Sequence, residues 1–435
     1  MTTDNHSGVP ADYGKKRPSW APDPALAAAL LAISLPAVLA VTETFTRTRG
    51  SMLDLRVYLW GGAYVDHAQN PYQHIFRHVL HFTYTPFAAA LFAVLVPLNL
   101  MVTRWLITAV SVASLAAVVW LTWGSLGHSR SRGRVGWTLA ATAVVVWIEP
   151  VRQTLSYGQV NLILMLLILA DLCMPDSRWW KGVGVGIAAG FKLTPLIFIP
   201  YLILTRRYRA AAVSVATFVV TALGSAVIMP AAAHDYWLNG LFINPNRIGN
   251  VRYVGNQSLY GAIARLAGST IAARPYQLAA VAVVGSAGLL LAAWASRRGQ
   301  EMVGILTCAL TGLLVSPVSW SHHWVWVAPM MVVLAHLATS PLALPSARRT
   351  RLACWLGIVA IAALFSGVLW LVPASAIQGL VMSAPDQLLG DIYVLAGLIG
   401  LAVTAGVLAS ARRRERRASA IASATATEAA LAQPG

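Results

Sequence analysis

Apolar runs of about 20 residues recur along this 435-residue chain, and they constrain its fold more than any other feature. Each run is long enough to cross a hydrocarbon core about 30 Å thick as an α-helix. Only 11% of the residues are charged, whereas a soluble domain has about 25%. The short alternating segments of an outer-membrane barrel are not found. The sequence therefore predicts an all-α, polytopic integral membrane protein.

The formal net charge of +17 does not indicate a nucleic-acid partner in this chain. The basic residues gather in short loops and tails, as at Lys15–Arg17 and Arg412–Arg417, where the positive-inside rule places them on the cytoplasmic side. Both termini are then cytoplasmic, and the number of crossings is even. Functional-looking polar sequence follows the first apolar run, which predicts a retained helix and not a cleaved signal.

The apolar runs predict about twelve membrane-spanning helices between a cytoplasmic N-terminal tail, 1–24, and a basic, disordered cytoplasmic C-terminal tail, 412–435. The membrane domain, 25–411, holds spans at 25–44, 84–99, 104–124, 136–149, 160–174, 182–204, 210–229, 275–296, 302–318, 323–339, 352–372 and 389–411.

Basic loops fix the cytoplasmic face, and alternation then places the long polar loops outside the cell. These external loops are 45–83, 230–274, 319–322 and 373–388, and their prolines and aromatic residues predict short helices on the membrane surface. The basic loop 127–134 conflicts with the count, because alternation places it outside as well. Either the rule fails at this loop or a neighbouring segment is re-entrant, and the short run 136–148 is a candidate for such a broken element.

Fifteen carboxylates are few enough to be considered one by one. Those that could belong to an external site are Glu43, Asp54, Asp66, Glu149, Asp235, Asp386 and Asp391. Asp54 follows the first apolar run, close to Arg56 and Tyr58. A carboxylate at a membrane boundary is unfavourable unless it is solvated or paired. Asp54 is therefore either a functional group or one half of a structural pair with Arg56.

Polar residues also interrupt the apolar sequence at several later points. Lys192 stands inside a long apolar run, where it needs a carboxylate, a phosphate or a route to the interface. Two adjacent histidines end another run, among three tryptophans. The remaining candidates include Arg247 and Arg252 as possible ligands of a lipid phosphate, Tyr84 at a helix start, Glu149, Arg152, Gln153, Tyr157, Gln159 and Asn161 between two runs, and Asn256, Gln257 and Arg265 in an external loop.

Each of these clusters also has an ordinary structural explanation. Tyr84 fits an aromatic anchor at the interface, and the stretch around Arg152 fits a plain loop. His322 and His323 suggest zinc, but a zinc site needs three or four ligands and the sequence supplies no convincing set. The three cysteines lie in or beside apolar runs without metal-ligand spacing, so they predict neither a disulfide framework nor a metal site.

Six blocks appear in an order that resembles the actinobacterial polyprenyl-phosphate-mannose-dependent α-(1→2)-mannosyltransferases, membrane glycosyltransferases of the GT-C fold. They cover most of the chain from Asp54 to Trp326 and read DLRVY, FTYTPFAA, IEPVRQTLSYGQVNLILML, FKLTP, NQSLYGAIARL and SPVSWSHHWVW. The second block departs from the family pattern, with FTYTP in place of FTYPP, which removes no reactive group.

The resemblance implies a polyprenyl-phosphate-mannose donor, a lipid-anchored mannoside acceptor and transfer on the periplasmic face of the plasma membrane. The acceptor would be a phosphatidylinositol mannoside or lipomannan. Asp54 and His322 would be catalytic. Arg56, Tyr84, Arg152, Gln159, Lys192, Asn256, Gln257, Arg265 and His323 would bind the donor phosphate or sugar.

One carboxylate is sufficient for an inverting transfer, and cations can stabilise the departing phosphate. We therefore expect no metal and no cofactor. An alternative within the same fold is a transferase of another polyprenyl-linked sugar, such as arabinofuranose. A different class is a flippase of a lipid-linked sugar, but such transporters often contain two related halves, and no clear internal repeat is found.

Overall fold

The computed structural model describes residues 21–49, 52–66, 69–77, 80–244, 247–340, 347–380 and 382–431. The described residues form an all-α bundle, as the sequence predicts, with one small antiparallel ribbon of β1 (Ile75–Phe76) and β2 (Leu80–His81). The predicted N-terminal tail up to residue 20 lies outside this description.

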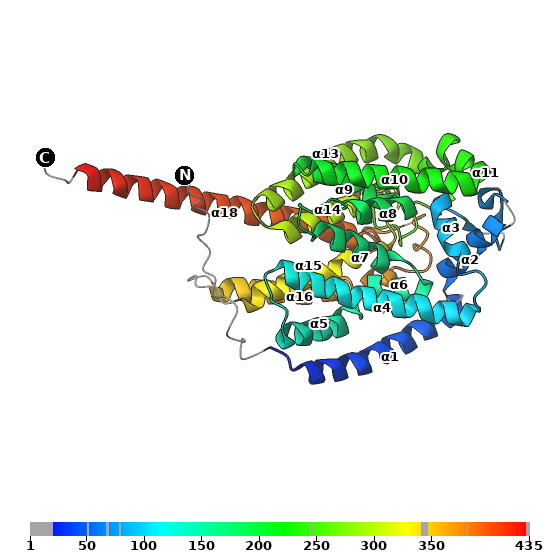
Figure 1. Cartoon of the computed structure of the whole chain (residues 1–435), viewed down its shortest axis with the longest axis horizontal. Helices are drawn as coiled ribbons and strands as arrows, with labels where there is room; N and C mark the ends of the chain where they lie inside the picture. The colour runs from blue at the N-terminus through cyan, green and yellow to red at the C-terminus, as the bar shows by residue number, and fades with distance from the viewer. Residues whose placement is uncertain are drawn as a thin grey trace.

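Long helices build the bundle, and short helices connect them (Figure 1). The longer helices are α1 (Pro24–Arg49), α4 (Leu100–Ser125), α5 (Arg132–Val145), α7 (Asn161–Leu172), α10 (Tyr208–Ile228), α13 (Thr270–Arg297), α14 (Glu301–Val315), α15 (Val327–Thr339), α16 (Ala347–Leu364) and α18 (Ile392–Leu431). The shorter α-helices are α2 (Leu53–Asp66), α3 (Pro86–Ala93), α6 (Glu149–Tyr157), α8 (Val183–Phe191), α9 (Phe198–Leu204), α11 (Pro230–Ala233), α12 (Leu259–Leu266) and α17 (Ala384–Gly390). Single turns are formed by η1 (Pro71–Gln73), η2 (Thr194–Ile197), η3 (His234–Leu238), η4 (Leu241–Ile243), η6 (Ser321–Trp326) and η7 (Val368–Leu371).

Five of the described helices are long and apolar enough to cross a membrane, namely α1, α4, α10, α13 and α18. The bent pair α6 and α7, whose axes differ by 116°, adds a sixth if it counts as one broken span. The predicted number of about twelve is therefore not confirmed by length and composition. α18 continues beyond residue 411, where the last span was expected to end, and it leaves the bundle as a long single helix (Figure 1).

The expected span 84–99 is wrong, because the helix in this region is short. α3 has eight residues, a length of about 12 Å, and turns follow it before α4 begins. Pro97 lacks a backbone N–H group, and Asn99 caps the next helix with its side chain, so helical structure stops and restarts here.

This correction removes the conflict at the basic loop 127–134. The loop lies at the same end of the bundle as the start of α1, because Gly133 and Gly136 pack against Ala21 and Pro22 (Figure 1). The guanidinium group of Arg134 donates to the carbonyl oxygens of Trp120 (2.6 Å) and His128 (2.9 Å) and lies over the Trp120 ring. The loop can therefore obey the positive-inside rule without a re-entrant segment at 136–148.

The expected span 182–204 is also wrong, because α8 and α9 are separate helices joined by a break at Lys192. Pro195 cannot donate the hydrogen bond that a continuing helix needs, and Lys192 itself has extended backbone angles. α8 packs closely on α10 through Gly182, Gly186 and Gly190, as their four-residue spacing predicts. The break places Lys192 at the tip of a short helical hairpin.

The loops at the end of the bundle that carries the 127–134 loop are tied together by charged groups. Arg207 donates to both carboxylate oxygens of Glu301, each at 2.6 Å, and also pairs with Asp176. Tyr201 and Ser296 donate to the same carboxylate of Glu301. The connections before α8, before α10 and before α14 therefore form one rigid end, opposite to the end at which α2, α3 and α11 gather (Figure 1).

We expect the loop 127–134 to be accessible only from the side of the membrane that carries the start of α1. In a variant without the three native cysteines, Ser129→Cys should react with a membrane-impermeant maleimide only after permeabilisation. Asn239→Cys, which follows η3 at the opposite end, should react in intact cells. Arg349→Cys at the start of α16 is the matched control and should behave as Ser129→Cys does. Labelling of Ser129→Cys in intact cells would contradict this arrangement.

Candidate active site

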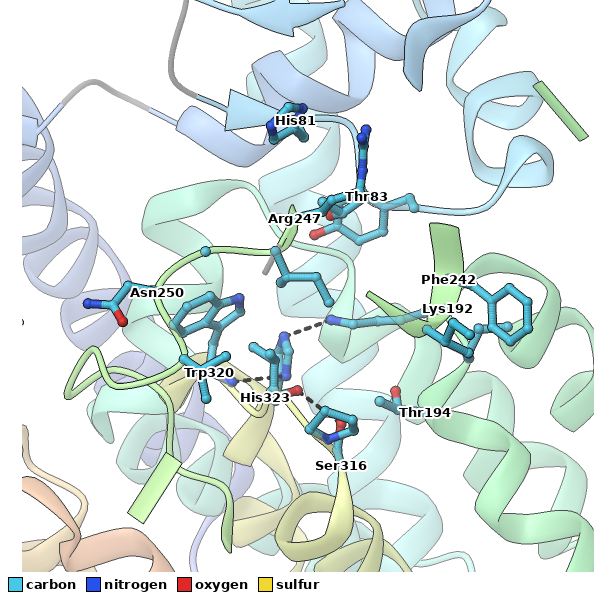
Figure 2. Close-up of a pocket in the computed structure, with 18 of the residues that line it drawn as sticks. His81, Thr83, Lys192, Thr194, Phe242, Arg247, Asn250, Ser316, Trp320 and His323 are labelled. Carbon is cyan, nitrogen blue, oxygen red and sulfur yellow. Dashed lines mark hydrogen bonds between the residues drawn. The ribbon is translucent and has the colours of Figure 1, made fainter. Parts of the chain in front are cut away.

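A cavity of about 1210 Å³ lies between α2, the tip of the α8–α9 hairpin, the segment 242–252, the start of α13 and the segment 312–323 (Figure 2). These are the predicted external segments together with Lys192, which the break between α8 and α9 brings to the same place. Asp54 is the only carboxylate among the described residues that line the cavity. The cations that line it are Lys192, Arg247, Arg252 and Arg274.

Asp54 stands in the first turn of α2, and a buried glutamine holds its carboxylate. Gln159 donates from Nε2 to Oδ2 of Asp54 (2.5 Å) and to the hydroxyl of Tyr84 (3.0 Å). The hydroxyl of Tyr58 donates to the carbonyl oxygen of Gln159 at 2.6 Å, which fixes the orientation of the amide. Tyr58 follows Asp54 by one helical turn, so both side chains lie on the same face of α2.

The close approach of α6 to α2 depends on Gly158. This glycine ends α6 with a φ of 66°, and a Cβ atom here would lie 2.7 Å from Cβ of Leu55. Only glycine combines this backbone angle with the required contact. The end of α6 therefore places Gln159 beside Asp54, and any other residue at position 158 would displace the neighbouring backbone.

Burial raises the pKa of Asp54 to about 6, although the hydrogen bond from Gln159 and the charge of Lys192 both act to lower it. A carboxylate with a pKa just below neutral pH is ionised under physiological conditions and still takes up a proton readily. Asp54 therefore has the properties of a general base.

Lys192 lines the same cavity and points toward His323 (Figure 2). Its Nζ atom lies 2.7 Å from Nε2 of His323 and donates to Oδ1 of Asn161 at 3.3 Å. The Nδ1 atom of His323 accepts the backbone N–H of Trp320 at 3.2 Å, so the imidazole ring cannot rotate away from the lysine. The ammonium group is thus positioned by neutral groups and is not cancelled by a neighbouring carboxylate.

The turn that carries His323 is braced from behind by a second buried carboxylate. Glu149 accepts hydrogen bonds from Ser321 (2.8 Å), Trp370 (2.8 Å) and Tyr393 (2.9 Å). The pattern links α6, η6, η7 and the start of α18. Glu149 was a plausible member of the external site by sequence, and its contacts assign it a supporting place outside the cavity.

The cavity brings together five of the predicted site residues, which are Asp54, Tyr84, Gln159, Lys192 and His323. They come from five separate parts of the sequence. Their convergence supports the prediction that these polar interruptions serve one site.

His322, Arg56 and Arg152 do not line the cavity, which corrects their predicted places. His322 is buried behind its neighbour, with its ring perpendicular to that of His323 and packed on Tyr157. Arg56 follows Asp54 by two residues, about 200° around the helix, and so faces another direction. Arg152 donates to the carbonyl oxygen of Ser366 at 2.6 Å.

Asn256, Gln257 and Arg265 do not line the cavity either, and all three are buried. Asn256 and Gln257 exchange hydrogen bonds with the backbone around Ser319 and Tyr393. Arg265 pairs with Asp391 and donates to backbone carbonyl oxygens of the same loop. These groups hold the external loops together. The side chain of Asp66, another predicted candidate, lies outside the described part of the chain.

Sequence reasoning missed several residues that line the cavity, above all Arg274, Trp320 and His81. Arg274 stands in the first turns of α13, where an arginine resembles an ordinary interface residue. Arg247 and Arg252 stood out in the sequence as possible phosphate ligands, and the structure places both on the cavity wall. The signal in the sequence was that these two arginines stand in the predicted external loop 230–274, before the next apolar run.

Among the described residues, no group of three or more histidine, cysteine, aspartate or glutamate side chains could hold a metal ion.

Comparisons with known proteins identify relatives of this chain. The model of glycosyltransferase family 87 matches residues 82–317, more than half of the chain. A polyprenol-phosphate-mannose-dependent α-(1-2)-phosphatidylinositol pentamannoside mannosyltransferase of Mycobacterium tuberculosis is 36% identical over 76% of this chain and 77% of its own length. The enzyme of the same name from Mycolicibacterium smegmatis is also 36% identical, over 80% and 82%. A phosphatidylinositol mannoside mannosyltransferase of M. smegmatis is 34% identical over 60% of this chain and 62% of its own length.

No solved structure matches the chain. The matched residues 82–317 include much of the cavity lining, such as Tyr84, Gln159 and Lys192, but not Asp54 or His323. The chain belongs to glycosyltransferase family 87.

Proposed function

We propose that this enzyme is an inverting α-(1→2)-mannosyltransferase that moves mannose from polyprenol-phosphate-mannose to a phosphatidylinositol mannoside or to lipomannan. The names of its relatives support this donor and the mannoside acceptor. The observation that carries the proposal is that two groups line the same cavity: Asp54, a carboxylate with a raised pKa, and Lys192, a lysine without a carboxylate partner.

The reaction needs one base. Asp54 removes the proton from the 2-hydroxyl of the acceptor mannose, and that oxygen attacks C1 of the donor mannose. The bond between C1 and the phosphate oxygen breaks, and its electron pair leaves with the polyprenyl phosphate. Attack from the face opposite to the phosphate converts a β-linked donor into an α-linked product, so no covalent enzyme intermediate is required.

The departing phosphate gains one negative charge, and Lys192 is placed to stabilise it. A fixed cation in a site that excludes water stabilises developing charge without reorganisation. Asn161 and His323 hold the lysine in position before the donor arrives. Lys192 and Asp54 form no ion pair with one another among the described contacts, so each remains available to its own substrate.

The cavity is lined by residues near α2, α3 and η3, which lie at the end of the bundle opposite to the basic loops around 127–134 and 205–209 (Figure 1). The positive-inside rule assigns those loops to the cytoplasm. Transfer on the external, periplasmic face of the plasma membrane follows from this polarity and is part of the proposal.

We expect Asp54→Asn to lower mannose transfer by about 10²- to 10⁴-fold, because the amide keeps the shape of the side chain and cannot accept the proton. Transfer is measured with purified protein, polyprenol-phosphate-mannose and phosphatidylinositol mannosides, and mass spectrometry identifies the product. Asp386→Asn, which changes a half-buried carboxylate at the start of α17 outside the cavity, is the matched control and should keep near-normal activity. Normal turnover in Asp54→Asn would refute the role of this residue.

The pH dependence should report the same carboxylate. Because the pKa of Asp54 is raised to about 6, the base is protonated and inactive below this pH and ionised above it. We expect kcat/KM to rise about tenfold per pH unit on the acid side and to level off above pH 6. The residual activity of Asp54→Asn should lack this step, and an identical step in that variant would assign the titration to another group.

We expect transfer to survive EDTA. Lys192 can neutralise the leaving phosphate, and the described residues offer no cluster with the three ligands that a catalytic zinc needs. The experiment treats purified enzyme with EDTA and then adds magnesium, manganese or zinc. Loss of activity that returns with one of these ions would show that metal chemistry takes part.

A further inference from the structure

We propose that Arg247, Arg252 and Arg274 form a second anion site, which binds the phosphodiester of the acceptor lipid and is separate from the donor phosphate at Lys192. This inference rests on the proposed function, because it describes how the same cavity selects its acceptor. It predicts that the enzyme recognises the lipid headgroup as well as the terminal mannose.

The chemistry of the transfer fixes the position of the donor phosphate. This phosphate is bonded directly to the oxygen on C1 of the mannose, so it must lie beside the atoms on which Asp54 acts. Lys192 is the cation whose charge acts on Asp54. Among the described contacts, none of the three arginines forms a hydrogen bond or ion pair with Asp54 or Lys192. The donor phosphate therefore belongs at Lys192, and the arginines are left for another anion.

Two of the arginines are held in place by backbone carbonyl groups. Arg247 donates to the carbonyl oxygen of Tyr72 at 3.0 Å, and the hydroxyl of Tyr72 donates to the backbone of Tyr84 at 2.6 Å. Arg252 donates to the carbonyl oxygen of Gly268, just before α13. In Figure 2, Arg247 lies with Thr83 and His81, on a different part of the wall from the contact between Lys192 and His323. These arginines are preorganised groups and not freely moving surface side chains.

Arg274 has an exposed side chain and no hydrogen-bond partner among the described residues. No carboxylate other than Asp54 is found on the described cavity wall, so these guanidinium groups lack a protein counterion there. Arginine presents several N–H donors in a plane, which suits the oxygens of a phosphate. A guanidinium group on a cavity wall without a protein counterion is free to bind an anionic ligand.

The surroundings favour a lipid phosphate over a free phosphate ion. Ile271 and Ile243 line the same cavity, and their exposed fractions are 86% and 70%. Ile248 adds a third apolar side chain next to Arg247. A ligand that contacts both groups carries a negative charge and hydrocarbon chains. The named acceptors of the relatives are phosphatidylinositol mannosides, in which a phosphodiester joins the lipid to the sugar.

The kinetic test compares two acceptors, a phosphatidylinositol mannoside and an alkyl α-mannoside with the same mannose residues and no phosphate. Arg274→Gln is the cleanest variant, because this guanidinium supports no backbone group. We expect its KM for the phosphate-bearing acceptor to rise about tenfold, while kcat, the KM for the donor and the KM for the alkyl mannoside stay unchanged. Arg130→Gln, an exposed arginine at the opposite end, should change none of these values.

An equal effect on both acceptors, or a raised KM for the donor, would overturn the assignment. A binding measurement without turnover keeps the inference testable if no mannose transfer is found. The full-length protein in detergent should bind short-chain phosphatidylinositol more tightly than the matching diacylglycerol, and Arg274→Gln should lose this preference. Inorganic phosphate should compete weakly. Unchanged phosphatidylinositol binding in the variant, or competition by inorganic phosphate as strong as that by the lipid, would refute a lipid phosphate site.

Discussion

Asp54 and Lys192, a carboxylate and an ammonium group, line one cavity in a largely apolar bundle without forming an ion pair with each other. Neutral side chains around the cavity hold each of the two groups in position. Isolated charges are unfavourable away from water, so each needs neutral hydrogen-bonding partners. Gln159 provides these contacts for Asp54, and Asn161 and His323 provide them for Lys192. Had the two groups paired directly, neither would be available to accept a proton or to meet a phosphate.

The buried charges outside the cavity have a structural task, because all of their partners belong to the protein. Arg265 is paired with Asp391, and Glu149 accepts three hydrogen bonds from three different segments. Breaking such a buried pair or network leaves an uncompensated polar group, which is strongly destabilising. These contacts fix the external loops to one another, and through Ser321 they fix the turn that presents His323. The rigidity of the cavity therefore depends on charges that never meet substrate.

The sequence was sufficient to predict the helical membrane class and to single out seven residues that line the cavity, namely Asp54, Tyr84, Gln159, Lys192, His323, Arg247 and Arg252. It could not separate Asn256, Gln257 and Arg265 from true ligands, because a polar residue in an apolar chain looks the same whether its partner is protein or substrate. The predictions of membrane spans at 84–99 and 182–204 were wrong for a related reason. Apolar composition persists across Pro97 and Pro195, whereas the backbone hydrogen bonds do not. Arg274 was missed because one arginine near a helix start carries no periodic signal.

The break at Lys192 also explains how lipid substrates can reach a charged group in this protein. α8 has nine residues, so it rises only about 14 Å, roughly half the thickness of a hydrocarbon core. A continuous helix would have carried Lys192 through the apolar interior, where no phosphate could follow. With the hairpin ending there, the cavity descends to the lysine from the external end, and the arginines along its wall compensate for the water that a phosphate loses on entry. The same interruption that defeats a span prediction from hydropathy is thus what brings Lys192 to the cavity that also holds Asp54.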